Sequence, residues 1–280
     1  MPPGVMAADD FGYLRERTVL VVTPHADDPA LFCGGTLALM ARAGARLVFV
    51  RITNDDTDSL GLTRRETVQA NAGELRDAAK HLGISEIVDF DYPSDRMSDV
   101  AETELREQLI RQVRIHRPYA VITFDPYSAF GEDNQDHVRT AQAMDETFWT
   151  AMFDKHHEEH FDQGLRPHGV VERWYFGRRV LDVTTVVDIS STLDVKCAAA
   201  AAHATMMANM VNQLGLMADT AGIPAPELEH VRSDPSEVVA LAVRAGAART
   251  GERYDIDAAE EFRVVRFSGM EPLLDLLASR

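Results

Sequence analysis

The stretch Thr18–Pro29 reads TVLVVTPHADDP and joins a β-branched apolar run to a polar turn. Such a run is typical of a buried parallel strand, and the residues from Ala30 onward indicate a helix. The turn therefore lies at the carboxyl end of a strand, where open α/β sheets place their ligands. His25 and Asp28 are three residues apart, so both side chains can face one point while Asp27 stays free for another role. An imidazole and a carboxylate supply two of the about three protein ligands that a catalytic divalent metal needs.

A third ligand for the same point is found in the segment 132–139, which reads EDNQDHVR. It follows a predicted strand over 119–124 and opens a helix that runs to about residue 153. Because the carboxyl ends of parallel strands share one rim of a sheet, we expect His137 to lie beside His25 and Asp28. Asp136 is placed to orient the imidazole or a bound water, as neighbouring carboxylates do in metal sites. Taken alone, the acids of the first turn would also fit a plain helix cap.

The alternation of strands and helices predicts an α/β fold: a Rossmann-like, mostly parallel sheet with helices on both faces and the active site at the strand carboxyl ends. Residues 1–280 are expected to form a single domain, in which 190–280 is a helical C-terminal part. Residues 154–169 are expected to be a polar insertion, most simply a loop at the mouth of the site, although its three clustered histidines leave a metal site as an alternative. Other strands are expected at residues 46–53, 86–91, 173–176, 183–189 and 262–267, and other helices at 31–43, 63–82, 101–116, 193–216 and 235–248.

The composition limits the classes of partner and the cellular compartment that we expect for this protein. Lys and Arg number 28 against 45 Asp and Glu, a formal charge of -17, and such a surface repels nucleic-acid backbones. Cys33 and Cys197 sit in apolar helical contexts and indicate core residues in a reducing compartment. No run has the length of a signal-peptide core or the roughly 18 apolar residues of a membrane span. We therefore expect a cytoplasmic protein without a membrane or nucleic-acid partner, and a homo-oligomer is compatible with the sequence.

These motifs resemble the PIG-L or LmbE-like family of metal-dependent N-deacetylases. The family's Pro-His-Pro-Asp-Asp, followed by Gly-Gly-Thr, corresponds to residues 24–28 and 34–36, at the same spacing. Its Glu-Leu-x-x-Ala-Ala-x-x-Leu-Gly corresponds to residues 74–83, and its His-Pro-Asp-His corresponds to residues 134–137. Later correspondences at 187–189, 196, 203, 254 and 259–262 extend the resemblance over nearly the whole chain.

The resemblance implies a hydrolase that removes an N-acetyl or other N-acyl group from an amino sugar or similar small substrate through a zinc-activated water. Residues and resemblance agree on Zn²⁺, with Fe²⁺ or another divalent metal as alternatives, held by His25, Asp28 and His137. Asp27 is placed to act as the general base, with Asp136 beside the site. The resemblance suggests substrate contacts at Arg64, Arg65 and Asp95.

One departure from the family bears on the mechanism. Asn134 replaces the first histidine of the third motif, and Ala26 replaces a proline whose side chain is not a ligand. An asparagine amide can donate a hydrogen bond to an oxyanion but cannot exchange a proton near neutral pH. His203 is then the next candidate for a proton donor. The loss also leaves open a metal-dependent hydratase that adds water to an unsaturated acid, and a binding protein without turnover is the third hypothesis.

Overall fold

A single eight-stranded sheet forms the centre of the computed structural model, which describes residues 3–128, 131–226, 228, 231 and 234–278. The strand order is β1-β7-β8-β6-β5-β2-β3-β4. All neighbouring pairs are parallel except those of β8, which runs antiparallel to β6 and β7. The predicted mostly parallel α/β sheet is therefore confirmed. The strands are β1 (Gly4–Met6), β2 (Thr18–Thr23), β3 (Arg46–Thr53), β4 (Ile84–Tyr92), β5 (Ala120–Phe124), β6 (Glu172–Phe176), β7 (Thr185–Asp188) and β8 (Ala259–Arg266).

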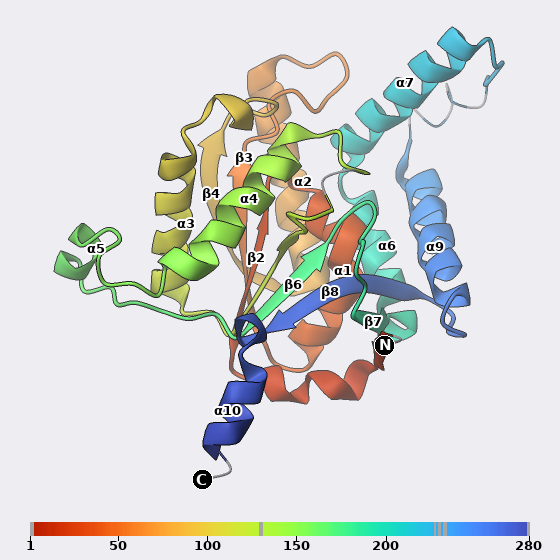
Figure 1. Ribbon diagram of the computed structural model, residues 1–280. Coiled ribbons are helices and arrows are strands. Elements are labelled where there is room, and N and C mark those ends of the chain that lie inside the picture. Colours follow the sequence, from red (N-terminus) through yellow and green to blue (C-terminus); the bar gives the residue numbers. More distant parts are fainter. Residues whose placement is uncertain (1–2, 129–130, 227, 229–230, 232–233, 279–280) are drawn as a thin grey trace.

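Helices cover both faces of this sheet (Figure 1). Side chains of α1, α2, α6 and α9 share one apolar core with one set of strand residues, and α3 and α4 share a second core with the alternate set. Among the described residues, no helix is both long and apolar enough to cross a membrane. The helices are α1 (Asp28–Arg42), α2 (Arg64–Leu82), α3 (Glu102–His116), α4 (Gln135–Thr150), α5 (Glu159–Asp162), α6 (Leu193–Ala201), α7 (Ala204–Ala221), α9 (Ser236–Glu252) and α10 (Glu271–Ala278).

The strand order creates a crevice between β2 and β5. From β2 the chain proceeds to β3 and β4 on one side, and then returns to β5 on the other side of β2. The connections α1 and α3 therefore cross opposite faces of the sheet, which opens a crevice at the carboxyl ends of β2 and β5. The turn after β2 carries residues 25–28, and the segment after β5 leads to α4 and His137.

Helix α1 is kinked directly after its first turns. Cys33 has non-helical backbone angles (φ -137, ψ 17), and the helix resumes beyond it. Glu260 of β8 caps the resumed helix, because its carboxylate accepts hydrogen bonds from the backbone N–H of Gly35 at 2.9 Å and of Thr36 at 2.8 Å. The Nζ of Lys196 donates to the same carboxylate at 2.5 Å. The kink thus depends on a buried ion pair supplied by the C-terminal part of the chain.

The helix predicted over residues 193–216 is wrong as one continuous element. It is broken at His203 (φ -85, ψ 53) into α6 and α7, and α7 projects from the body (Figure 1). The carboxylate of Glu74 accepts hydrogen bonds from the backbone N–H of Thr205 at 3.0 Å and from its hydroxyl at 2.7 Å. This distant cap satisfies the first turn of α7, so a new helix can begin there.

The polar insertion 154–169 does not lie at the mouth of the site, and that expectation is wrong. Arg114, near the C-terminal end of α3, donates to the carbonyl oxygen of Phe153 at 2.8 Å. His168 contacts the carbonyl oxygen of Pro118, just before β5, at 2.8 Å. The insertion therefore packs near the amino ends of the strands, opposite the rim that carries the predicted site. His160 is buried there between Arg114 (3.0 Å) and Glu107 (2.8 Å). Its ligand atoms lie within 4.8 Å of those of His157 and Glu159, so the metal alternative for this insertion stays a prediction.

The single-domain organisation over 1–280 stays a prediction. It is supported by the sheet, in which β8 of the C-terminal part pairs with β6 and β7. In the predicted C-terminal segment, residues 227, 229–230, 232–233 and 279–280 lie outside the described residues.

Candidate metal centre

Three side chains converge at the crevice between β2 and β5. The Nδ1 of His25 lies 3.1 Å from the Nε2 of His137, and the Asp28 carboxylate oxygens lie 3.6 Å and 3.3 Å from these two atoms. Metal bonds of about 2.0–2.1 Å in a tetrahedral arrangement separate neighbouring ligand atoms by roughly 3.3 Å. The three side chains thus already place their ligand atoms at the spacing required by one divalent ion. His25, Asp28 and His137 are the three residues that the sequence analysis predicted as metal ligands.

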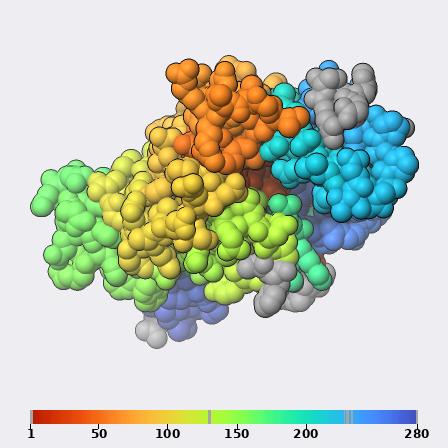
Figure 2. Space-filling view, turned by 90° about the horizontal axis from the view of Figure 1, so that it is seen from above, coloured from red at the N-terminus to blue at the C-terminus, as the bar shows by residue number. Residues whose placement is uncertain are grey.

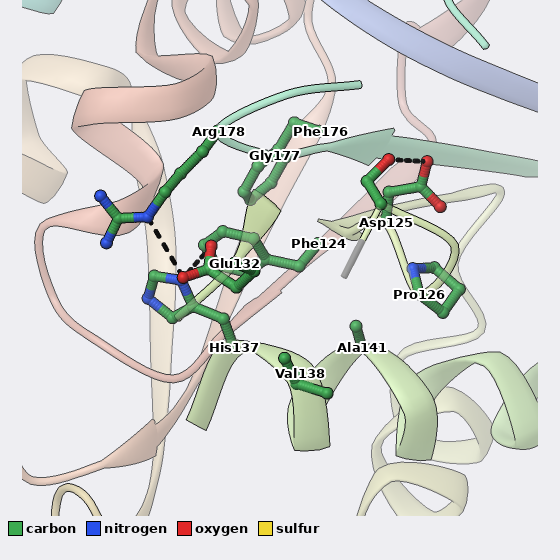
Figure 3. A pocket seen from close by; sticks show the side chains of 11 residues that line it. Phe124, Asp125, Pro126, Glu132, His137, Val138, Ala141, Phe176, Gly177 and Arg178 are labelled. Carbon is green, nitrogen blue, oxygen red and sulfur yellow. Dashed lines mark hydrogen bonds and ion pairs between the residues drawn. The ribbon is translucent and has the colours of Figure 1, made fainter. Parts of the chain in front are cut away.

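Each of the two histidines has a carboxylate on its other ring nitrogen. Asp136 Oδ2 lies 3.4 Å from the Nε2 of His25, and Glu132 Oε2 lies 2.9 Å from the Nδ1 of His137 (Figure 3). Carboxylates in this position fix the tautomer and the orientation of metal-binding imidazoles. Asp136 was expected beside His137, but it faces His25 instead, because α4 turns its side chain toward the end of β2. The partner of His137 is Glu132, which the sequence reasoning did not single out.

The electrostatics of the centre favour a bound cation. Burial alone would lower the pKa of both histidines, but Asp28 and the flanking carboxylates outweigh it and raise the pKa of His137 to about 9 and that of His25 well above its usual range. Burial likewise opposes ionisation of Asp28, yet the two histidines hold its pKa below the ordinary value. The carboxylates of the centre therefore favour positive charge on or beside the histidines, and a bound divalent ion would supply that positive charge.

Asp27 differs from the other acids of the centre. Its side chain is 7% exposed, and within the part of the chain that the structure describes its carboxylate accepts no hydrogen bond. Burial and the adjacent charge of Asp28 raise its pKa to about 8, a shift that a bound cation would oppose. By contrast, Asp55 is held by Arg51 at 3.0 Å and Thr53 at 3.2 Å. Among the described residues, Asp27 is thus a buried acid without a hydrogen-bond donor, in the turn that supplies two of the ligands and within electrostatic reach of Asp28 and His25.

Asn134 is the N-cap of α4. Its Oδ1 accepts a hydrogen bond from the backbone N–H of Asp136 at 2.8 Å. The same Asp136 carboxylate accepts hydrogen bonds from the backbone N–H of Asp95 at 2.7 Å and of Met97 at 3.1 Å. Asp95 in turn accepts a hydrogen bond from the hydroxyl of Thr57 at 3.0 Å. The loops after β3, β4 and β5 are therefore tied together at the rim.

The remaining expected residues are not part of the three-ligand group. Arg64 forms an exposed ion pair with Asp56, and Arg65 is exposed on the first turn of α2. His203 is fully buried at the junction of α6 and α7, and neither ring nitrogen has a partner among the described residues. Burial lowers the pKa of His203 to about 4, and its role as a proton donor stays a prediction.

Two features of the centre were missed in the sequence. Glu132 lies five residues before His137, a spacing without helical or strand periodicity, and the turn between them brings it back. The ring of Phe124 stacks on the ring of His137 with centroids 4.0 Å apart, and its position at the end of a predicted strand could have suggested this.

Seen from above, the surface is hollowed between the β3–α2 segment (orange) and α7 (cyan), over a floor formed by the first part of the chain (Figure 2).

Comparisons with known proteins agree with this fold. The family model PIG-L, described as GlcNAc-PI de-N-acetylase, matches residues 20–148. The chain is 25% identical to the 1D-myo-inositol 2-acetamido-2-deoxy-alpha-D-glucopyranoside deacetylase of Mycobacteroides abscessus, with 79% of this chain and 94% of that protein covered. The N,N'-diacetylchitobiose deacetylase from Pyrococcus horikoshii has a TM-score of 0.73 at 21% identity, with 93% of this chain and 88% of that chain covered. GalB, the 4-carboxy-2-hydroxymuconate hydratase of Pseudomonas putida, has a TM-score of 0.61 at 19% identity, with 89% and 96% covered.

The structure combines an α/β sheet with a His-Asp-His cluster at its switch point that could hold a metal ion. Residues 20–148, which contain this cluster, match the PIG-L (LmbE-like) family model, and the resemblance drawn from the sequence is confirmed. The N-deacetylase expectation is confirmed at the level of the family, since the relatives are deacetylases by name. The hydratase is a weaker likeness and shares the fold.

Proposed function

We propose that this protein is a zinc-dependent N-deacetylase acting on an N-acetylated amino sugar or a similar small amide. His25, Asp28 and His137 would hold the Zn²⁺, a set of two nitrogens and one oxygen that suits zinc and leaves one position for water. The observation that carries the proposal is the Asp27 carboxylate, which is buried in the turn that supplies His25 and Asp28, interacts electrostatically with both, and accepts no hydrogen bond from the described residues. A base in that position has a use only when a proton must be removed there.

The chemistry divides between the ion and the side chains. A bound Zn²⁺ supplies a Lewis acid that polarises an amide carbonyl and makes water acidic. Asp27 accepts the proton of the attacking water and returns it to the leaving amine, so one carboxyl group serves as base and then as acid. The amide N–H of Asn134 donates to the carbonyl oxygen as negative charge develops on it. Asp136 and Glu132 hold the two imidazoles in orientation.

The substrate class is proposed from the relatives and from the rim. The relatives are named for N-acetylated sugar substrates. Asp95, on the loop after β4, and Arg64 and Arg65, on the first turn of α2, stay predicted substrate contacts. The cytoplasmic location, the absence of a nucleic-acid partner and a homo-oligomeric state stay predictions.

Metal analysis combined with a substrate panel tests the proposal. The purified protein should contain about one zinc per chain, and His137→Ala should lose it, while the exposed His81→Ala on α2 serves as a matched control and keeps it. The zinc-loaded parent should release acetate from at least one member of a panel of N-acetylglucosamine, N,N'-diacetylchitobiose and N-acetylglucosaminyl inositol. Zinc in both histidine variants would refute the ligand assignment, and a zinc-loaded parent that releases no acetate would refute the deacetylase. The hydratase alternative would then be tested by the ultraviolet loss of a conjugated acid.

A further inference from the structure

A groove of about 700 Å³ adjoins the metal centre. The segment 177–183 after β6 forms one wall, and α9 and the start of β8 form the other. Its apolar end is lined by Leu31 and Phe32 of α1 and by Phe176. The volume falls in the range of roughly 300–1,000 Å³ that is usual for small-molecule sites. The groove can therefore hold a group larger than an acetyl.

Direct contacts connect this groove with the metal centre. The rings of Phe32 and His137 have centroids 6.3 Å apart, and those of Phe32 and Phe176 are stacked at 5.3 Å. Arg178 lines the groove and also donates through its Nε to Glu132 at 3.1 Å, and Glu132 contacts His137 (Figure 3). A sugar whose acetamide lies at the metal centre would therefore extend the rest of the molecule into the groove.

The groove gathers four cationic side chains, although the chain carries a formal charge of -17. Three of them are paired with carboxylates: Arg178 with Glu132 (3.1 Å), Lys196 with Glu260 (2.5 Å) and Arg253 with Glu261 (2.8 Å). The fourth, Arg179, is exposed. Its guanidinium forms no ion pair or hydrogen bond with any residue that the structure describes.

An unpaired guanidinium in a groove is suited to bind an oxyanion. Its planar fork can donate two parallel hydrogen bonds to a carboxylate or a phosphate, and these charge-assisted bonds are roughly twice as strong as neutral ones. The three neighbouring cations have already satisfied their charge within the protein, so Arg179 supplies the free charge of the groove. The surrounding acidic surface would repel an anion at other positions.

We propose that the groove binds the part of the substrate beyond its amino sugar, and that Arg179 selects substrates carrying a carboxylate or a phosphate in that part. The inference rests on the proposed deacetylase activity and narrows its substrate class to anionic N-acetylglucosaminides. The role of Arg179 is recognition, and the reacting amide lies at the metal centre.

Three glycosides of N-acetylglucosamine with arms of equal length test the proposal: the propyl, carboxyethyl and phosphoethyl glycosides. In the zinc-loaded parent, kcat/KM for acetate release should be about 10-fold higher for the preferred anionic probe than for the propyl probe, through a lower KM. Arg179→Gln should bring that ratio to about 1. Arg249→Gln, an exposed arginine on α9 outside the groove, should keep the ratio of the parent. The more active anionic probe tells which oxyanion the groove prefers.

Binding measurements keep this test independent of turnover. Calorimetry with zinc-loaded Asp27→Asn protein should show tighter binding of an anionic probe than of the propyl probe, and the added Arg179→Gln change should abolish the difference. Equal affinities for all three probes, or a preference that survives in Arg179→Gln, would overturn the anion site and leave the deacetylase intact. Anion-selective binding that depends on Arg179, without acetate release by the parent, would support the groove and refute the deacetylase.

Discussion

Asn134 has two candidate roles that substitutions can separate. As the N-cap of α4, its side-chain oxygen accepts the backbone N–H of Asp136 at 2.8 Å. As a catalytic group, its amide N–H would donate to the carbonyl oxygen of the substrate. Asn134→Ser and Asn134→Asp keep a cap acceptor but lose the amide donor, whereas Asn134→Ala loses both.

The two roles predict different magnitudes in different measurements. Loss of an N-cap costs about 1 kcal/mol of unfolding free energy, so Asn134→Ala should be destabilised by that amount and the serine and aspartate variants should be near the parent. Loss of one oxyanion donor lowers kcat by roughly 10²- to 10³-fold. Alanine should show this loss, serine should show less of it because its hydroxyl can still donate, and aspartate should be slower still because its carboxylate repels the developing negative charge.

The assay compares acetate release and urea unfolding for the three variants, each at confirmed zinc content. Parent-like kcat in Asn134→Asp and Asn134→Ala, together with a destabilised Asn134→Ala, would show that the residue is a helix cap and refute its catalytic role. A uniform loss of zinc would instead place the effect on His137, whose helix Asn134 begins.

Three further predictions concern the base, the kink and an ion pair at the rim. Asp27→Asn should keep the zinc and lose about 10²- to 10⁴-fold in kcat because an amide accepts no proton, and near-parent turnover at full zinc content would exclude Asp27 as the base. Glu260→Gln leaves a buried ammonium without its counter-charge and should lower the unfolding free energy by about 3 kcal/mol in urea titrations; a change within error would mean that the cap is dispensable. Burial alone would raise the pKa of Asp125, but hydrogen bonds from Arg263, the backbone N–H of residue 127 and the hydroxyl of residue 128 hold it below its ordinary value. The stabilisation by ionised Asp125 is therefore present above the unfolded pKa of about 3.9 and is lost as the pH falls through the lower folded pKa. Asp125→Asn should cost about 2 kcal/mol of unfolding free energy at pH 7, and its difference from the parent should shrink below about pH 4. A difference that is independent of pH would contradict the assignment.

The sequence was informative where the determining interactions are local. The β-branched run before His25 and the three-residue spacing to Asp28 specify a strand, a turn and two ligands within a dozen residues. The strand before the second motif places His137 on the same rim, because parallel strands share their carboxyl edge. These statements needed no knowledge of side-chain packing, and the structure agrees with them.

The sequence was uninformative where a carboxylate acts across the fold. The break at His203 depends on Glu74, which lies 131 positions before the Thr205 that it caps. The exchange of partners, in which Asp136 faces His25 and Glu132 faces His137, depends on how the loop after β5 folds back. Helical periodicity and capping motifs describe neighbours in sequence, so neither contact has a local signal.

The two halves of the chain contribute differently to the centre. Residues 20–148, which the family model matches, contain the three ligand residues and both carboxylates that flank the histidines. The segment of α1 that carries Asp28 ends at a kink, and the kink is fixed from outside that range by Glu260, 224 positions beyond Thr36. A Cβ at Gly35 would lie 2.6 Å from Ile189, so this glycine lets the C-terminal part approach the kink closely. The C-terminal part therefore also supports the geometry of the centre, and truncation after residue 148 should remove that support together with three of the eight strands, β6, β7 and β8.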